Sequence, residues 1–225
     1  MKSIAIIPAY NEEVAISAIV KRSLKFVDYV LVVDDGSTDR TSQIAKDAGA
    51  RVIKHYNNLG KGVSLKDAFA EVRGYDIVVT IDGDGQHNPN EMPELMRPIR
   101  EGRADIVNGS RYLNGSDDAS AYRRAGLRVL DIATNITSGT HVTDSQSGFR
   151  AFSGKTIPYF RFRDTGFGIE SEMLADAAEN NFRILEVPIT VRYDVENPST
   201  NGPVNHVMGV LFKIIIDKII RTFKR

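Results

Sequence analysis

Apolar runs alternate with helix-like segments through the first half of the chain. The apolar runs are rich in β-branched residues and span 3–8, 29–35, 50–55, 75–82 and 104–110. Each run stays apolar through its middle, which is typical of strands that are covered on both faces of a parallel sheet. Apolar residues recur near helical spacing in 12–25, 39–48, 60–72 and 90–101. The alternation predicts a doubly wound α/β fold with one mostly parallel sheet flanked by helices.

The pattern changes after residue 110. A basic segment around 122–128 is followed by a Gly/Ser/Thr-rich stretch at 137–148 and a helix-like segment at 168–180. The run 181–193 alternates between apolar and polar residues, which predicts a strand. Pro188 favours an edge position or a bulge for this strand, because proline cannot donate a hydrogen bond to a neighbouring strand.

The chain divides into one domain and a C-terminal segment. Without internal repeats or low-complexity linkers, residues 1–203 are expected to form a single domain with two halves, 1–110 and 111–203. The remaining segment, 204–225, predicts an amphipathic helix whose mostly basic charged residues lie close to one stripe. Such a helix can lie at a membrane surface, in the interface of a lipid bilayer. The alternative is packing on its own domain or on a second copy of the chain in a homodimer.

Composition excludes several classes of protein. Lys plus Arg and Asp plus Glu both number 29, and this balance gives no reason to expect a nucleic-acid partner. The absence of cysteine excludes disulfide frameworks, zinc–thiolate sites and thiol catalysis, and it fits a reducing cytoplasm. The apolar run at the N-terminus is too short for a signal peptide, and no window of about 20 apolar residues predicts a membrane-spanning helix. We therefore expect a cytoplasmic protein.

The segment IDGDGQHNP, 81–89, places Asp82, Asp84 and Gln86 directly after an apolar run. Alternate positions beyond a strand end can direct oxygen atoms to one side, and two nearby carboxylates repel each other unless a cation or a proton lies between them. Mg2+ typically binds one or two carboxylates and completes its coordination with water and substrate phosphates. The segment therefore predicts a divalent cation that binds a diphosphate. The alternative is an acidic turn without a ligand, because Asp and Gly favour turns.

Two other strand ends carry groups that suit a nucleoside. Asp34 and Asp35 end the second apolar run, and their carboxylates can accept hydrogen bonds from a base N–H and a ribose hydroxyl. Pro8, Tyr10 and Glu12 end the first run and suit the edge of a base or ribose. Ligands of doubly wound sheets bind beyond the carboxyl ends of the strands. Three such ends therefore predict one ligand site.

Taken together, these motifs resemble glycosyltransferase family 2. The resemblance is carried by IIPAYNEE, VVDDGSTDRT, NNLGKG, IDGDGQHNP, GSR and DSQSGFRAF, and it runs from about residue 3 to residue 193. Within the family, the motif order and the basic middle segment are most similar to dolichyl-phosphate (polyprenyl-phosphate) mannose or hexose synthases. The resemblance implies a GT-A fold, with a Rossmann-like sheet whose first half binds a nucleotide sugar and whose second half binds the acceptor.

The activity that this resemblance implies is hexose transfer with inversion. A mannose- or glucose-type sugar would pass from a GDP- or UDP-hexose to a polyprenyl or dolichyl phosphate, giving a lipid-linked monosaccharide. The enzyme would be metal-dependent and peripheral at the cytoplasmic face of a membrane, which segment 204–225 would contact. Two alternatives stay open: transfer to a sugar hydroxyl of a growing glycan, and a non-catalytic module that binds nucleotide sugars.

The resemblance also assigns donor residues. For the nucleotide sugar it implies Pro8, Tyr10, Glu12, Asp34, Asp35, Lys61, Asp82 and Gly83. For Mg2+ or Mn2+ it implies Asp82, Asp84 and Gln86. The alternative for Lys61 is a solvated lysine at the start of a helix.

Arginines of the second half are the expected acceptor ligands, because planar guanidinium groups suit phosphate oxygens. The resemblance implies that Arg111, Arg192 and one of Arg123 and Arg124 bind the lipid phosphate, with a surface position as the alternative for each. A phosphate acceptor is already anionic near neutral pH, so no base has to remove a proton. We therefore expect Asp144 to orient sugar hydroxyls or arginines. The predicted catalytic residues are Asp84, Arg111 and Asp144.

Overall fold

A computed structural model of the chain describes residues 1–113, 121–192 and 203–223, except for the side chains of 121–123, 203–207 and 223. The strands are β1 (Ser3–Ala9), β2 (Tyr29–Asp34), β3 (Arg51–Lys54), β4 (Ile77–Thr80), β5 (Ile106–Ser110), β6 (Arg150–Ser153) and β7 (Ile184–Pro188). The helices are α1 (Ile16–Ser23), α2 (Thr41–Asp47), α3 (Lys61–Glu71), α4 (Met92–Arg100), α5 (Ala121–Ser138), α6 (Ile169–Glu179) and α7 (Pro203–Phe223). Two short 3-10 helices are η1 (Pro89–Glu91) and η2 (Gly154–Tyr159).

The seven strands form one sheet in the order β3-β2-β1-β4-β6-β5-β7. The mostly parallel sheet predicted from the sequence is confirmed, and each of the five predicted apolar runs contains a strand. β7 lies at an edge, as Pro188 indicated. β6 was not predicted, and it runs antiparallel to both of its neighbours, β4 and β5.

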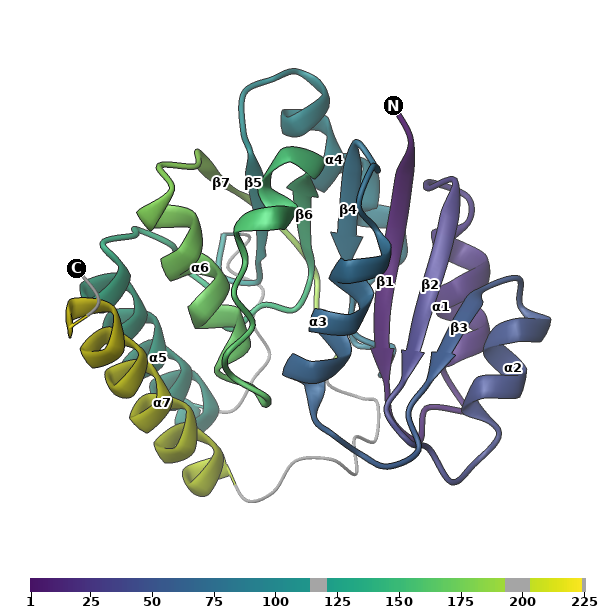
Figure 1. Cartoon of the computed structure of the whole chain (residues 1–225), viewed down its shortest axis with the longest axis horizontal. Helices are drawn as coiled ribbons and strands as arrows, with labels where there is room; N and C mark the ends of the chain where they lie inside the picture. Colours follow the sequence, from purple (N-terminus) through teal and green to yellow (C-terminus); the bar gives the residue numbers. More distant parts are fainter. Residues whose placement is uncertain (114–120, 193–202, 224–225) are drawn as a thin grey trace.

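Helices cover both faces of the sheet, which explains why the strands are apolar throughout (Figure 1). In β1, Ala5 and Ile7 pack against the α1, α2 and α4 side, whereas Ile4 and Ile6 pack against the α3 and α6 side. All four side chains are at most 5% exposed. Burying one such aliphatic side chain stabilises the fold by roughly 1.5–3 kcal/mol, so both faces of the sheet contribute to its stability.

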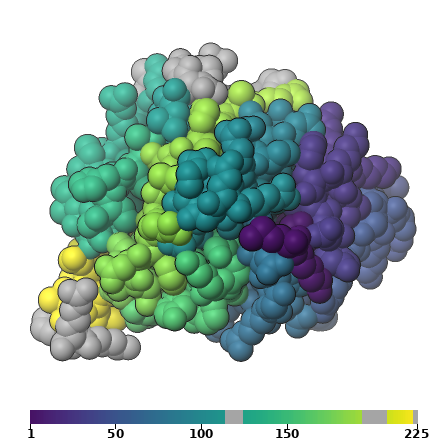
Figure 2. Space-filling view, turned by 90° about the horizontal axis from the view of Figure 1, so that it is seen from above, coloured from purple at the N-terminus to yellow at the C-terminus, as the bar shows by residue number. Residues whose placement is uncertain are grey.

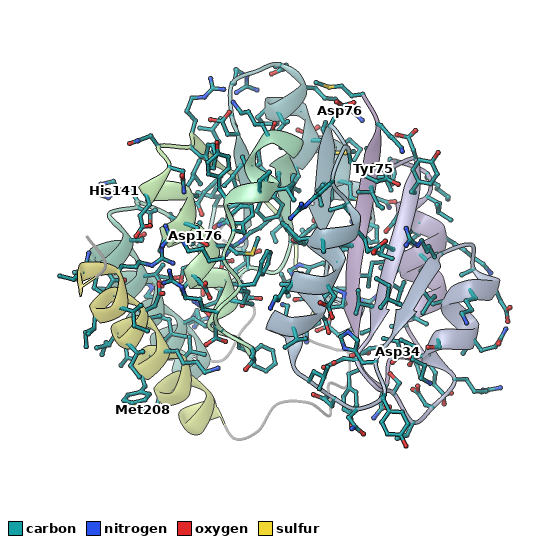
Figure 3. The ribbon with its side chains drawn as sticks, viewed as in Figure 1. Asp34, Tyr75, Asp76, His141, Asp176 and Met208 are labelled. Carbon is teal, nitrogen blue, oxygen red and sulfur yellow. The ribbon has the colours of Figure 1, made fainter. Side chains whose placement is uncertain are left out.

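The carboxyl ends of β1, β2, β3 and β4 all point to the same edge of the sheet (Figure 1). Asp34 marks this edge at the end of β2 in Figure 3. β5, which is parallel to β7 and antiparallel to β6, also ends there, directly before Arg111. The topology therefore gathers the sequence motifs at one edge.

α7 packs on its own domain at the end of the molecule opposite α2, as the views from the side and from above both show (Figures 1 and 2). Val210 and Ile214 contact Leu130 of α5. The charged stripe of α7 also faces the domain: Lys213 contacts Asp164 at 3.0 Å. In the described part of the chain, no helix is long and apolar enough to cross a membrane.

Several other apolar residues of α7 point outward. Met208, Phe212, Ile215 and Ile219 are between 47% and 64% exposed, and Met208 lies on the outer side of α7 in Figure 3. The orientation therefore differs from that of an ordinary surface helix, in which the polar face meets water. Ion pairs with the domain hold the charged stripe of α7 inward.

Candidate active site

A cavity of about 430 Å³ lies at the edge of the sheet where β1, β2 and β4 end. It is lined by Pro8, Ala9, Tyr10, Glu12, Asp35, Asn58, Gly60, Lys61, Ser64, Asp82, Gly83, Asp84 and Phe167. Every residue predicted to bind the nucleotide sugar, except Asp34, is among them. The cavity thus brings together four motifs that lie far apart in the sequence.

Three residues lie close to the Asp82 carboxylate. Its Oδ1 atom lies 2.6 Å from Nζ of Lys61, and its Oδ2 atom lies 3.9 Å from Nε2 of His87. A Cβ atom on Gly148 would lie 2.3 Å from Oδ2 of Asp82, so any side chain there would displace the carboxylate. Burial lowers the pKa of His87 to about 4, and its ring is therefore neutral near pH 7.

Negative charge is concentrated in this cavity. Burial, together with the nearby charge of Asp82, raises the pKa of Asp84 to about 6. Burial raises the pKa of Glu12 to about 7, with Asp84 and Asp82 adding to the effect. For Asp82, burial alone would raise the pKa, but the ammonium group of Lys61, together with His87 and Arg111, lowers it. Carboxylates that repel one another in this way are suited to a cation.

The donor set fits Mg2+ or Mn2+ only in part. Among the described residues, no group of three or more His, Cys, Asp or Glu side chains is arranged to hold a metal ion. Asp82 and Asp84 supply two carboxylates, so the remaining oxygen ligands would come from water and a diphosphate, as is usual for Mg2+. The site is therefore consistent with a metal that binds together with a nucleotide.

Gln86 supports the turn around Asp84 through its backbone. Its N–H donates to Oδ1 of Asp84 at 3.0 Å, and its carbonyl accepts a hydrogen bond from the N–H of Arg192 at 2.9 Å. Gln86 is not among the residues that line the cavity. Its predicted role as a metal ligand stays a prediction.

Replacing Glu12 by glutamine should remove a pH-dependent cost to stability. The folded protein keeps the Glu12 proton up to about pH 7, whereas the unfolded chain releases it near 4.5, so stability falls as the pH rises between these values. Glu12 is half-buried, and solvent screening reduces the effect. We expect E12Q to raise the free energy of unfolding by about 1–2 kcal/mol at pH 8 and to leave it nearly unchanged at pH 4.

Urea unfolding of wild type and E12Q across this pH range measures the effect. The exposed Asp47→Asn variant on α2 is the control and should follow the wild type at each pH. Equal stability of E12Q and wild type at pH 8 would contradict the predicted cost.

Asp34 does not line the cavity, and its predicted contact with the nucleoside stays a prediction. Its side chain is fully buried, and its carboxylate accepts hydrogen bonds from the N–H of Ser37 at 2.8 Å and from the hydroxyl of Ser42. Lys54 lies 3.8 Å away. The carboxylate is thus occupied within the protein, where it stabilises the loop after β2.

Asp35 lines the cavity and also shapes its wall. Its carboxylate accepts hydrogen bonds from the backbone N–H groups of Leu59 and Gly60, at 2.9 and 2.8 Å. Nδ1 of His55 lies 2.7 Å from Oδ1 of Asp35, and Nε2 lies 3.2 Å from Asp67. Asp35 therefore holds the loop that leads into α3, beside any contact it makes with a nucleoside.

Asp144 orients Arg111, one of the two roles expected for it. Nε and Nη2 of Arg111 donate to the two carboxylate oxygens at 2.6 and 3.1 Å, and the backbone N–H of Arg111 donates at 3.1 Å. Asp144 is 1% exposed. Because both carboxylate oxygens bind the guanidinium group, Asp144 is a positioning residue and is poorly placed to act as a base.

The other predicted acceptor arginines differ in exposure and in how much of each residue the structure describes. Arg192 is exposed, follows β7 and is tied by its N–H to Gln86, which places its backbone beside the acidic turn. Arg124 is half-buried in the first turns of α5. The side chain of Arg123 lies outside the described residues. Of the predicted acceptor arginines, Arg111 directly follows β5 at this edge of the sheet, and Arg192 lies beside the acidic turn.

Glu170 is a charged residue near the site that the sequence analysis missed. It lies in the first turn of α6, is 5% exposed, and its Oε1 atom lies 2.7 Å from Nζ of Lys61. An acidic residue two positions after the Gly-rich turn GFG, at the start of a helix, was the available signal. Phe167 in the same turn lines the cavity and was also missed.

Comparisons with known proteins place the chain among sugar transferases. Residues 4–157 match the family model described as glycosyl transferase family 2. The UDP-N-acetylglucosamine–dolichyl-phosphate N-acetylglucosaminyltransferase of Methanococcus voltae is 35% identical over 214 residues, which cover 84% of each chain. The undecaprenyl-phosphate mannosyltransferase of Micrococcus luteus is 32% identical and covers 84% of this chain and 83% of its own length.

Solved structures show the same fold. Glucosyl-3-phosphoglycerate synthase from Mycobacterium tuberculosis, crystallised with Mg2+ and uridine diphosphate, matches with a TM-score of 0.74. The two sequences are 27% identical, and the match covers 95% of this chain and 76% of that chain.

Proposed function

The chain belongs to glycosyl transferase family 2 and has the GT-A fold, and from this premise we propose that it transfers a hexose, with inversion, from a nucleotide diphosphate sugar to a polyprenyl or dolichyl phosphate. Two relatives are named for dolichyl-phosphate and undecaprenyl-phosphate acceptors, which supports a lipid phosphate. The observation that carries the proposal is the acidic cavity at the ends of β1, β2 and β4, together with an arginine after β5, at the same edge of the sheet, that a buried aspartate orients.

The cavity is suited to the donor. Tyr10 and Phe167 line it with partly exposed aromatic rings, which can pack against a base or a sugar. Mg2+ or Mn2+ bound at Asp82 and Asp84 would neutralise the charge that develops on the departing nucleoside diphosphate. Lys61 adds a positive charge at the same place. These residues bind and orient the diphosphate so that C1 of the sugar faces the acceptor.

The acceptor phosphate needs arginines more than it needs a base. Its second pKa is near 6, so it is largely anionic at neutral pH and can attack C1 without losing a proton. Arg111, fixed by Asp144, and Arg192 would hold this anion close to the negatively charged donor. Because Asp144 is occupied by Arg111, the geometry favours a phosphate acceptor over a sugar hydroxyl.

A panel of donors and acceptors tests the proposal. GDP- and UDP-linked mannose, glucose and N-acetylglucosamine are each supplied with Mg2+ or Mn2+ and a short polyprenyl phosphate, a free glycan or 3-phosphoglycerate. Lipid-linked monosaccharide is the expected product. Transfer to the glycan or to 3-phosphoglycerate without lipid product would overturn the proposed acceptor, and binding of nucleotide sugars without any transfer would favour the non-catalytic module.

We also propose that the exposed apolar residues of α5 and α7 contact a lipid bilayer, as a lipid acceptor requires. In α5, Val129, Ile132 and Ile136 are 48%, 60% and 75% exposed. In α7, Phe212 and Ile219 are 64% and 49% exposed. α5 and α7 contact each other through Leu130 and Val210. The exposed apolar residues therefore belong to one pair of packed helices. An amphipathic helix that lies in the bilayer interface inserts its apolar side in this way.

Introducing charge on this helix pair should weaken binding to vesicles. For the double variant I136E/F212E we expect at least about a 10-fold lower partition onto vesicles of phosphatidylcholine and phosphatidylglycerol, measured by sedimentation, because each glutamate would have to enter the interface. Val14→Glu, at a position 95% exposed on the other side of the sheet, is the control and should bind like wild type.

Two outcomes contradict the membrane contact. The first is equal binding of wild type and the double variant, or no binding of the wild type at all. The second is a wild-type dimer that the double variant converts to a monomer while neither binds vesicles, which would make this surface an interface between two copies.

A further inference from the structure

Lys61 lies between two carboxylates at the floor of the cavity. Its Nζ atom is 2.6 Å from Oδ1 of Asp82 and 2.7 Å from Oε1 of Glu170. The side chain of Lys61 is 15% exposed, that of Asp82 is 26% exposed and that of Glu170 is 6% exposed. Asp82, a predicted metal ligand, is therefore already paired with a cation that belongs to the protein.

The backbone fixes where Lys61 points. It lies between Gly60 and Gly62, and the N–H of Gly62 donates to the carbonyl of Thr165 at 3.0 Å. A Cβ atom would lie 2.2 Å from the Thr165 oxygen at Gly60 and 2.0 Å from the Asp164 oxygen at Gly62. Only glycines allow the chain to approach this loop so closely. The close approach places the start of α3 beside the loop before α6 and brings Lys61 within reach of Glu170.

Glu170 is a second ion-pair partner for Lys61. Its Oε2 atom is buried and has no hydrogen-bond partner among the described residues. A small cavity of about 10 Å³ adjoins it and is lined by Lys61, Asp82, Gly148 and Arg150 as well. A buried carboxylate oxygen without a hydrogen-bond partner costs free energy. The carboxylate of Glu170 is therefore stabilised when the ammonium group of Lys61 leaves Asp82 and binds Glu170 alone.

We infer that Lys61 competes with the divalent cation for Asp82 and that a nucleotide diphosphate relieves this competition. The inference rests on the proposed function, because it assumes that the cavity binds a diphosphate. A diphosphate draws the Lys61 ammonium group away from Asp82, and Glu170 keeps it paired while it turns. The metal and the nucleotide then strengthen each other's binding, since such coupling is reciprocal. The protein would bind metal weakly until the donor arrives.

Mn2+ binding in the absence of turnover tests this inference. Free Mn2+ is measured by electron paramagnetic resonance during titration of wild type and Lys61→Met, alone and with UDP or GDP. We expect K61M to bind Mn2+ at least about 5-fold more tightly than wild type without nucleotide, and to show a smaller gain when nucleotide is added. Equal or weaker binding by K61M without nucleotide would overturn the inference.

Two further variants sharpen the result. Lys66→Met makes the same substitution at an exposed position of α3 and should change Mn2+ affinity by less than about 2-fold, because exposed charges at a distance are screened. Glu170→Gln should have the opposite effect to K61M. With Glu170 neutral, Lys61 remains on Asp82, and we expect about 3-fold weaker Mn2+ binding without nucleotide. If K61M does not fold, E170Q tests the competition between Lys61 and the metal by itself. Unchanged or tighter Mn2+ binding by E170Q would contradict this competition.

The same titrations separate this inference from the proposed function. If wild type binds Mn2+ more tightly with nucleotide but K61M and E170Q leave the nucleotide-free affinity unchanged, the competition is wrong and the donor site stands. If wild type binds Mn2+ with neither UDP nor GDP, the donor site itself is wrong and the inference falls with it.

Discussion

Asp84→Asn should lower kcat for sugar transfer at least about 100-fold, because electrostatic stabilisation of a developing charge is among the largest catalytic effects of single residues. Asparagine keeps the shape of the side chain and can still accept the backbone N–H of Gln86, which Asp84 accepts at 3.0 Å. It lacks the negative charge that we propose holds a cation at the diphosphate. The fold should therefore persist while the transfer step is lost.

The measurement is initial-rate kinetics with the donor and acceptor that the panel identifies. The exposed Asp47→Asn variant is again the matched control and should retain wild-type kcat. Titration of Mn2+ in the presence of the nucleotide should show weaker binding by D84N. If kcat of D84N were within about 3-fold of wild type, the acidic turn would not take part in the reaction.

Arg221→Met should lower the free energy of unfolding by about 3–5 kcal/mol, the range found when one partner of a buried ion pair is removed. Arg221 lies in α7 with a side chain only 6% exposed. Its Nη1 atom contacts Asp176 at 2.7 Å and Glu179 at 3.1 Å, and its Nε atom donates to Asp217. Asp176 lies on α6 and is labelled in Figure 3.

The cost arises because Asp176 is fully buried and would lose its closest cation. Burial already raises the pKa of Asp176 even with Arg221 beside it. Lys218→Met, at an exposed position of the same helix, is the control and should cost less than about 1 kcal/mol. Arg221→Lys should lower the free energy of unfolding by an amount between those of R221M and Lys218→Met, since lysine keeps the positive charge but lacks the planar guanidinium group. A loss below about 1 kcal/mol for R221M would show that the ion pairs do not hold α7.

Much of the donor site could be predicted from the sequence because of one topological rule. In a parallel sheet the carboxyl ends of the strands share an edge, so residues that follow different strands are brought together without knowledge of the packing. Pro8 lies near the end of β1, Tyr10, Asp35 and Asp82 follow three different strands, and all four residues line the cavity. Asp34 is the exception. Adjacent residues at a strand end point to opposite sides, and the sequence did not indicate which of the two acids would face the cavity.

The acceptor side was harder to predict because its residues come from segments without a regular pattern. The ion pair of Arg111 with Asp144 spans 33 positions, and β6 joins the sheet antiparallel between β4 and β5. Neither feature has a local signal, because each depends on how a long connection returns to the sheet.

The sequence by itself determined the layered fold, the edge that carries the acidic cavity and the chemical character of its residues, since these follow from periodicity, strand order and residue type. Only the tertiary structure decided which partners these residues have: Lys61 between Asp82 and Glu170, Asp144 on Arg111, and α7 with its charged stripe turned inward. The physical reason is that a helical pattern defines two faces but not which of them meets the protein. That choice depends on charges supplied by residues elsewhere in the chain, such as Asp176 and Asp164.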